Sequence, residues 1–230
     1  MKILGLIGGI SWVSTLDYYK LINLGINEQL GDLNFAECMI YSFNYQDIKN
    51  NNDSGNWDKT LQMLTRAATG MKNGGAEGIV LCANTMHKIA DALEQNVQLP
   101  VIHIAKVTAE AIAEQGLYKI GLLGTKFTME EPFFRDKLTE RGIDIVIPED
   151  AERAHMHYTI FEELGRNIFK PETKQFYVEV INKLVAQGAQ GIILGCTEIP
   201  LLISEEDVDI PLFDTTQIHA KAAVKFALGK

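Results

Sequence analysis

The amino-acid sequence predicts an α/β protein with two pseudo-symmetric Rossmann-like lobes, each built on a parallel sheet. Short apolar runs typical of buried strands alternate with amphipathic segments typical of helices. The order of these segments in the first half of the chain recurs in the second half. The strands end in loops rich in Gly, Ser, Thr and Asn, and ligands of α/β sheets bind beyond the carboxyl ends of strands. We therefore expect an active site in the cleft between the two lobes.

The first strand has a clear counterpart in the second half of the chain. Lys2–Gly8 and Lys119–Gly124 are apolar runs that begin with Lys-Ile and end with the tetrapeptides GLIG and GLLG. Apolar runs of this length between helical segments are typical of strands in a parallel sheet that is covered by helices on both faces. We expect both runs to be buried strands.

An amphipathic helix, a Gly turn and a buried strand come next in each half. Residues 56–81 and 171–194 show this order, and the heptapeptides GAEGIVL and GAQGIIL within them share five of seven residues. The offset between the halves falls from 116 residues at the GLIG and GLLG pair to 113 residues at the heptapeptides. Such a slow drift is expected of a duplicated unit that has gained small insertions or deletions.

The last strands complete each half and set the predicted domain boundaries. LPVIHI, at Leu99–Ile104, is similar to IPLFDT, at Ile210–Thr215, and each leads into an Ala-rich helix. We predict an N-terminal lobe of residues 1–104 plus 214–230 and a C-terminal lobe of residues 105–213, with the final helix returning to the first lobe.

Two other segments are less regular. Cys38 lies in AECMIYSF, which we interpret as a core strand that buries the thiol. Residues 47–59 are polar and turn-rich, and we interpret them as a long surface loop or a mobile flap.

The composition is that of an ordinary globular protein and argues against some classes of function. The 230 residues are 47% hydrophobic and 22% charged, with a net charge of -9. No Lys/Arg cluster stands out, so nucleic-acid binding is not expected. The apolar run Ile3–Ile10 is too short to span a bilayer and no cleavage site follows it, so we expect neither a membrane segment nor a signal peptide. The three cysteines form no CxxC, which favours reduced thiols in a cytoplasmic protein.

Four predicted strand ends carry the polar loops GGIS, CANT, GTKFT and GCTE. Their backbone N–H groups and hydroxyls, including those of Ser11 and Thr125, can bind an anion. The loops contain neither G-x-G-x-x-G nor GxxxxGK[ST], so they suit a small carboxylate better than a dinucleotide.

Two cysteines, Cys82 and Cys196, stand at strand ends that the repeat relates to each other. A thiol beside backbone amides can have a lowered pKa. One thiolate can remove a proton from a tetrahedral carbon while the other thiol delivers a proton to the opposite face, which inverts the centre without a cofactor. The alternative is a pair of buried cysteines that act as small hydrophobic residues.

GLIGGIS near the start, IVLCANTMHK in the first half and IILGCTEIP in the second resemble the aspartate/glutamate racemase family, within the wider Asp/Glu/hydantoin racemase superfamily. The resemblance covers the whole chain. It implies an amino-acid racemase, usually a homodimer, that needs no PLP or other cofactor. It implies L/D interconversion of aspartate, glutamate or a related amino acid, with two cysteines as acid and base.

The resemblance also implies roles for particular residues. Asn84, Thr85 and Thr197 would bind the α-carboxylate of the substrate. Arg166 would meet a distal carboxylate, and the alternative is a solvent-facing Arg at a helix end. Glu198 follows the second cysteine in the same motif, where it can orient or deprotonate the thiol.

The two cysteines differ in register by one residue. Aligned without gaps, Cys82 lies on Gly195 and Ala83 lies on Cys196, so Ala83 holds the slot in which the family pattern has its first cysteine. A shift of one residue along a strand turns a side chain to the other face. Either Cys82 points into the core, and Thr85, a nearby His or a bound water supplies the second proton, or a bulge re-aims Cys82. We take Cys82 and Cys196 as the catalytic pair, with Ala83 as the register alternative.

Three histidines complete the candidates. We interpret His87 as a helix-end residue that faces solvent or caps the helix, and the alternative is a catalytic role. His155 and His157 form an H-x-H without a third ligand, so we expect no metal site. Two other functions stay open: a single-thiol decarboxylase or isomerase that uses Cys196, and a carboxylate-binding module without catalysis.

Overall fold

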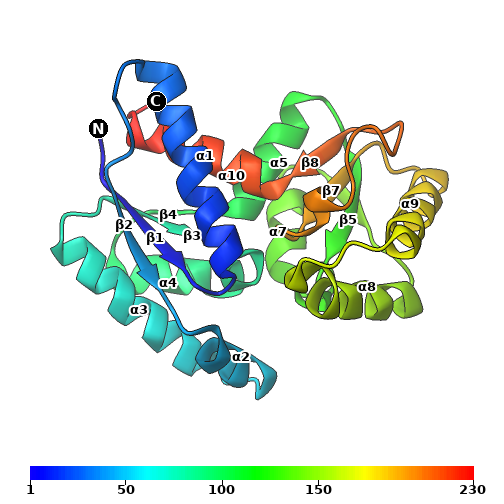
Figure 1. Ribbon diagram of the computed structural model, residues 1–230, viewed down its shortest axis with the longest axis horizontal. Helices are drawn as coiled ribbons and strands as arrows, with labels where there is room; N and C mark the ends of the chain where they lie inside the picture. Colours follow the sequence, from blue (N-terminus) through cyan, green and yellow to red (C-terminus); the bar gives the residue numbers. More distant parts are fainter. The chain divides into compact units, whose positions relative to one another are not determined.

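The computed structural model describes residues 1–230 and divides into two compact units. The first unit comprises residues 1–103 and 219–230, and the second comprises residues 104–218. Each unit contains a four-stranded sheet of parallel strands, in the orders β2-β1-β3-β4 and β6-β5-β7-β8 (Figure 1). The predicted α/β class with two parallel sheets is confirmed. None of the helices combines the length and the apolar character that crossing a bilayer requires.

The first unit contains four strands and the helices between them. In chain order these are β1 (Leu4–Gly8), α1 (Trp12–Leu30), β2 (Cys38–Ser42), α2 (Tyr45–Asp53), α3 (Trp57–Asn73), β3 (Gly78–Leu81), the 3₁₀ helix η1 (Asn84–Ile89), α4 (Ala90–Val97) and β4 (Val101–Ile102). The C-terminal part of α10 (Thr215–Ala227) completes this unit.

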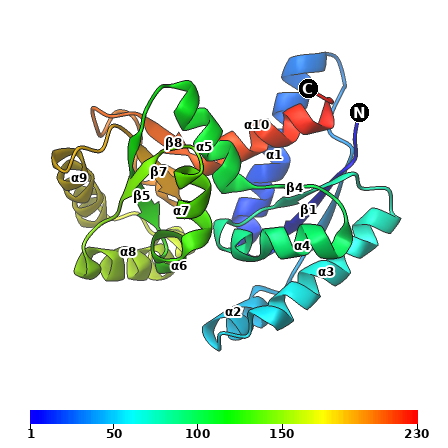
Figure 2. The same ribbon diagram turned by 180° about the vertical axis from the view of Figure 1, so that it is seen from behind.

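The second unit has the same strand pattern with more helices. Its elements are α5 (Ile104–Glu114), β5 (Lys119–Gly124), α6 (Lys126–Glu130), α7 (Pro132–Thr139), β6 (Asp144–Val146), α8 (Asp150–Glu162), η2 (Leu164–Arg166), α9 (Pro171–Ala186), β7 (Ile192–Gly195), η3 (Ile199–Leu201) and β8 (Leu212–Asp214). Figure 2 shows this unit from behind, with α5 and α7 near each other.

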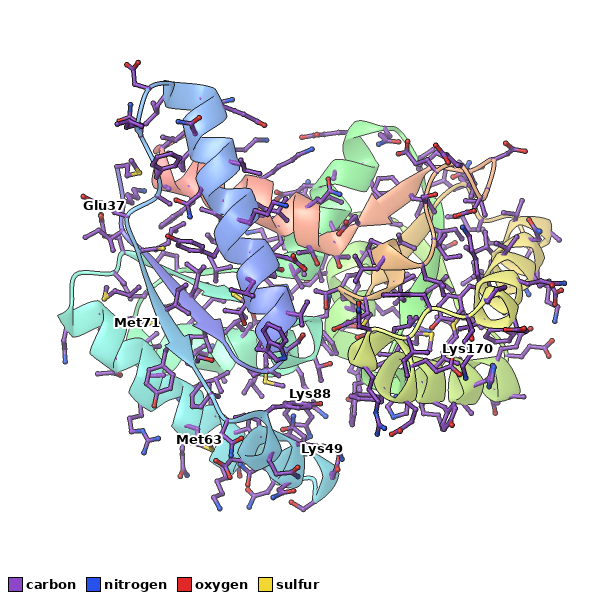
Figure 3. The ribbon with its side chains drawn as sticks, in the orientation of Figure 1. Glu37, Lys49, Met63, Met71, Lys88 and Lys170 are labelled. Atoms are coloured by element: carbon purple, nitrogen blue, oxygen red, sulfur yellow. The ribbon has the colours of Figure 1, made fainter.

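Helices cover both faces of the first sheet, which explains why β1 and β3 are apolar along their whole length. On one face α10 packs so closely that a Cβ on Gly78 would lie 2.5 Å from the ring of Phe226. On the other face Met71 of α3, labelled in Figure 3, comes within 2.9 Å of a Cβ built on Gly5. Glycine at both strand positions therefore lets helices lie close to the sheet.

The sequence repeat is visible in the strand register. Gly5 of β1 pairs with Ile79 of β3, and Gly121 of β5 pairs with Ile192 of β7. The two sheets therefore place equivalent residues of GLIG and GLLG beside equivalent residues of the two heptapeptide strands. This register supports the gap-free alignment of the two cysteine motifs.

Two segments differ from the sequence-based interpretation. β2, which holds Cys38, is an edge strand, and its thiol is only partly buried. The polar segment of residues 47–59, expected to be a loop or flap, contains most of the helix α2 and the first turn of α3. Ile48 is fully buried and Asn51 is buried beside it, so one face of α2 is anchored although the rest of the segment is polar.

Candidate functional site

The turn between β1 and α1 forms the first part of the candidate site. Gly9 adopts a φ of 78°, which favours glycine, and its N–H donates to Thr15 Oγ1 at 2.9 Å. Ser11 caps α1, because its side chain accepts a hydrogen bond from the backbone N–H of Ser14. The Ser14 hydroxyl in turn donates to the carbonyl oxygen of Cys82 at 2.7 Å. The turns after β1 and β3 are thus fastened together.

The structure places Cys82 inside the first unit. The residue is 1% exposed, and its sulfur lies 3.9 Å from the carbonyl oxygen of Val80. Burial raises the pKa of the Cys82 thiol far above its ordinary value, and the nearby Cys38 thiol adds to the rise. Ala83, the next residue, is extended and partly exposed. The inward position therefore carries the thiol and the outward position carries a methyl group.

The residues after Ala83 begin the 3₁₀ helix η1. Asn84 is buried and Thr85 is partly exposed, so both stand at the carboxyl end of β3 as expected. His87 is 1% exposed, so the expectation of a solvent-facing histidine is wrong. Its Nδ1 lies 3.2 Å from the carbonyl oxygens of both Ala83 and Asn84, at the start of η1.

In the second unit, the turn after β5 is built around Thr125. This buried residue caps the short helix α6, and its hydroxyl oxygen accepts a hydrogen bond from Thr128 N at 3.4 Å. Gly124, the last residue of β5, pairs with Gly195 at the end of β7. Thr125 and Cys196 therefore follow neighbouring strands at the same edge of the sheet.

Cys196 lies directly against a carboxylate. Its thiol donates to Glu198 Oε2 at 2.8 Å, and the Thr197 hydroxyl donates to the same oxygen at 2.7 Å. Burial and the negative charge of Glu198 hold the pKa of the Cys196 thiol well above its ordinary value. The resting pair is therefore a neutral thiol and a carboxylate, and the carboxylate can take the thiol proton when the sulfur acts as a base.

Gly195 explains why the second unit has no side chain at the position of Cys82. A Cβ on Gly195 would lie 2.7 Å from the carbonyl oxygen of Leu123 and 3.1 Å from a methyl carbon of Thr128. Real Cβ atoms do not approach backbone oxygens that closely, so this strand end requires glycine.

Tyr177 is a residue that the sequence did not single out. It is buried on α9, and its hydroxyl lies 3.2 Å from the Thr159 hydroxyl. Burial raises the pKa of Tyr177 far above its ordinary value, and the nearby Cys196 and Glu198 add to the rise. No motif marked this tyrosine, because it lies inside an amphipathic helix.

Arg166 lies on a separate segment, at the end of η2. Its side chain is 62% exposed and pairs with Glu162 at 2.6 Å. The segment is anchored by Glu163, whose buried carboxylate accepts hydrogen bonds from Lys170 at 2.8 Å and from Thr173 at 2.5 Å. Lys170 is labelled in Figure 3. Arg166 therefore stands on a fixed segment with its guanidinium at the surface.

Residues 7–223 match the family described as Asp/Glu/Hydantoin racemase. The chain belongs to this family. It is 49% identical to a Yersinia pestis protein assigned to the Asp/Glu racemases, with a TM-score of 0.95 over 99% of this chain and 100% of the other. It is 35% identical to an aspartate racemase homologue from Pyrococcus horikoshii OT3, with a TM-score of 0.86 over 99% and 100% of the two chains. Broad specificity amino-acid racemase RacX of Bacillus subtilis is 22% identical over 86% of this chain and 85% of the relative.

Membership of the Asp/Glu/Hydantoin racemase family implies an isomerase activity and a small amino-acid substrate. Within each unit the structure collects the predicted site residues at the carboxyl ends of neighbouring strands. These residues are Ser11, Cys82, Ala83, Asn84 and Thr85 in the first unit, and Thr125, Cys196, Thr197 and Glu198 in the second. Arg166 is the predicted site residue that lies elsewhere, on η2.

Proposed function

We propose that this protein is an amino-acid racemase that acts without PLP on aspartate, glutamate or a related amino acid. The observation that carries the proposal is the hydrogen bond of 2.8 Å between the Cys196 thiol and the Glu198 carboxylate. A thiol bonded to a carboxylate can serve as an acid in its resting form and as a base once its proton has moved to the carboxylate. Racemisation needs both behaviours at Cα.

The proposed reaction breaks and remakes one C–H bond. As the Cys196 thiol proton moves to Glu198, the sulfur takes the proton from Cα, and the electron pair of the broken bond spreads into the α-carboxylate. Hydrogen bonds from Asn84, Thr85 and Thr197 to that carboxylate would stabilise the developing negative charge. Return of a proton to the opposite face of Cα gives the other enantiomer.

We assign Cys196 as the thiol that reacts with substrate, and Cys82 as a core residue. Cys82 is 1% exposed and its pKa is raised by burial, which disfavours the thiolate. Ala83, at the partly exposed position, has no proton to transfer. Thr85 or a bound water would then give its proton to the opposite face of Cα, and the proton held by Glu198 would return to that group through water. In the alternative of two catalytic thiols, Cys82 must leave the core.

We also propose that Arg166 binds a distal substrate carboxylate in place of Glu162, its present partner. Arg can bind a carboxylate with two hydrogen bonds. Arg166→Ala should raise KM for Asp and Glu much more than KM for Ala. Arg135→Ala, a change at another exposed arginine, is the control and should leave KM for all three substrates unchanged. Equal effects on all three substrates would contradict this assignment.

The experiment that tests the function is Cα deuterium exchange followed by NMR. The protein is incubated in D2O with each enantiomer of Asp and Glu, without added PLP, and Cys196→Ala serves as the control. Exchange with inversion from both enantiomers supports a racemase. Exchange without inversion favours the single-thiol decarboxylase or isomerase, a function that Ala83 also fits. No exchange with any of the four substrates would contradict racemisation of acidic amino acids.

The homodimer implied by the resemblance is part of the proposal. Sedimentation of the chain, whose mass is 25.6 kDa, should show a species of twice that mass. A monomer at micromolar concentration would contradict it.

A further inference from the structure

Four polar rings lie buried together in the first unit, and the proposed chemistry uses none of them. They belong to Tyr18 of α1, His87 of η1, His103 after β4 and His219 of α10. The ring of His87 lies 5.0 Å from that of His103 and 5.2 Å from that of His219. Buried titratable side chains are costly unless their hydrogen bonds are arranged to suit one protonation state.

The contacts of His219 define its protonation state. Its Nε2 lies 2.5 Å from the carbonyl oxygen of Ile102, which can only accept, so Nε2 carries a hydrogen. Its Nδ1 lies 2.7 Å from the Tyr18 hydroxyl. The hydroxyl donates to a bare Nδ1 in this arrangement, so both ring nitrogens are satisfied in the neutral form.

His87 shows the opposite tautomer. Its Nδ1 faces two carbonyl oxygens, of Ala83 and Asn84, each at 3.2 Å. A bare nitrogen would repel both oxygens, so Nδ1 carries the hydrogen and donates to the pair. Its Nε2 is buried and makes no hydrogen bond of good geometry, although the Ile102 carbonyl group also acts on the ring, so the two acceptors at Nδ1 decide where the hydrogen lies. Burial and the adjacent His103 together lower the pKa of His87 to about 3.

The carbonyl groups that His87 holds belong to the turn that follows β3. The Ala83 carbonyl oxygen also accepts from Met86 N at 3.3 Å, so it makes two hydrogen bonds. One residue earlier, the Ser14 hydroxyl donates to the Cys82 carbonyl oxygen. The turn is thus held by α1 at Cys82 and by His87 at the next two residues, which leaves the backbone around Asn84 and Thr85 little freedom.

We propose that His87 is a positioning residue: its neutral imidazole, backed by the rings of His103 and His219, clamps the Ala83 and Asn84 carbonyl groups and so fixes the turn that presents Asn84 and Thr85 to substrate. This inference rests on the proposed function, in which Asn84 and Thr85 bind the α-carboxylate. The alternative is that His87 only fills space in the core.

Two substitutions separate clamping from packing. In His87→Asn the amide nitrogen can occupy the place of Nδ1, whereas in His87→Gln it reaches the place of Nε2 instead. We expect His87→Asn to keep kcat/KM within about fivefold of the wild type and His87→Gln to lose about 10- to 100-fold, because small misplacements of binding groups have effects of that size. If both variants lose kcat/KM equally, with rates calculated per amount of folded protein, the proposal is overturned. His155→Asn, at an exposed histidine, is the control.

A readout without substrate separates this inference from the proposed function. Hydrogen exchange at the amides of Asn84, Thr85 and Met86 should be faster in His87→Gln than in His87→Asn. Nitrogen NMR of the histidines should show His87 as the Nδ1–H tautomer from pH 8 to pH 5, with His103, His219 and Tyr18 as its titratable neighbours. An Nε2–H tautomer, or equal exchange in both variants, would overturn the clamp. If the wild-type protein exchanges no Cα hydrogen, the proposed racemase function is refuted. The amide exchange rates and the His87 tautomer would still decide whether His87 holds the turn.

Discussion

The ends of β3 and β7 are equivalent in the repeat but carry their functional groups on opposite sides. In the first unit the inward position holds the thiol of Cys82 and the outward position holds Ala83. In the second unit the inward position holds Gly195 and the outward position holds the thiol of Cys196. Two cysteines that look alike in the sequence therefore have different environments: the Cys196 thiol lies against the Glu198 carboxylate, whereas the Cys82 thiol faces the Val80 carbonyl oxygen.

The turns after β3 and β7 also carry different functional groups. With the same offset of 113 residues that relates Ile79 to Ile192, His87 corresponds to Pro200. The first turn is held by an imidazole that binds backbone carbonyl groups, and the second contains a carboxylate that binds a thiol. We interpret the first strand end as a part that positions substrate and the second as the part that transfers the proton.

Removing each thiol in turn should give the largest difference between the two strand ends. Cys196→Ala removes the proposed acid and base, so we expect Cα exchange to fall at least about 10³-fold, within the range seen for general acid–base groups. Cys82→Ala should change kcat by less than about tenfold, since the effect is limited to repacking of a buried site. Initial rates of deuterium incorporation from both enantiomers provide the measurement.

The control for this pair is unfolding in urea, which shows whether either variant is folded at the assay temperature. Similar losses of exchange in two folded variants would mean that both thiols react with substrate, and the interpretation of Cys82 as a core residue would be wrong.

Glu198→Gln tests why the two thiols differ. The change keeps the size of the side chain but removes the charge that accepts the Cys196 proton. We expect kcat to fall by about 10²-fold, as for loss of a proton acceptor. The charge of Glu198 is also one cause of the raised pKa of Cys196, so that pKa should fall and alkylation by iodoacetamide at pH 8 should become faster. Slower alkylation in the variant would show that Glu198 activates the resting thiol instead.

The repeat made most of the fold predictable. GLIG and GLLG, with the two heptapeptides, mark β1, β3, β5 and β7 because buried parallel strands need continuous apolar residues. The strand β6 escaped notice because it has only three residues, Asp144–Val146, none of them fully buried. The helix α2 was missed because two buried residues anchor a segment that is otherwise polar.

The residue types of the site could be predicted from the sequence, but the directions in which their side chains point could not. Glu198 beside Cys196 was expected from their spacing, and the hydrogen bond between them agrees with it. The orientation of Cys82 stayed open in the sequence because a bulge can reverse the face that a strand residue occupies. His87 was expected to face solvent or cap a helix, and its burial was missed because its neighbours His103 and His219 come from distant parts of the chain.

Gly195→Ala sharpens the comparison of the inward positions. The new Cβ would lie 2.7 Å from the Leu123 carbonyl oxygen, so the strand end must shift. We expect the free energy of unfolding to fall by about 1–3 kcal/mol, as for overpacked cores. Gly70→Ala, at a helical glycine with open space around it, is the matched control and should be neutral or stabilising. Equal stabilities of the two variants in urea would show that β7 tolerates a side chain where β3 carries Cys82.

The smallest expected effect is a pH dependence that belongs to the first unit. Burial lowers the pKa of both His87 and His219 to about 3, whereas an unfolded histidine titrates near 6.5. The unfolded chain therefore binds more protons, so stability is complete above pH 6.5 and decreases as the pH falls below it. Between pH 7 and pH 6 the two residues together should lower the free energy of unfolding by about 1 kcal/mol.

Urea unfolding at the two pH values measures this loss of stability. The loss should be smaller in His219→Gln, because Gln keeps a donor for the Ile102 carbonyl group without a titratable ring. Hydrogen exchange should also show the lost protection in α1 and η1 rather than in α8 and α9, and a uniform loss over both units would assign the acid sensitivity to other groups.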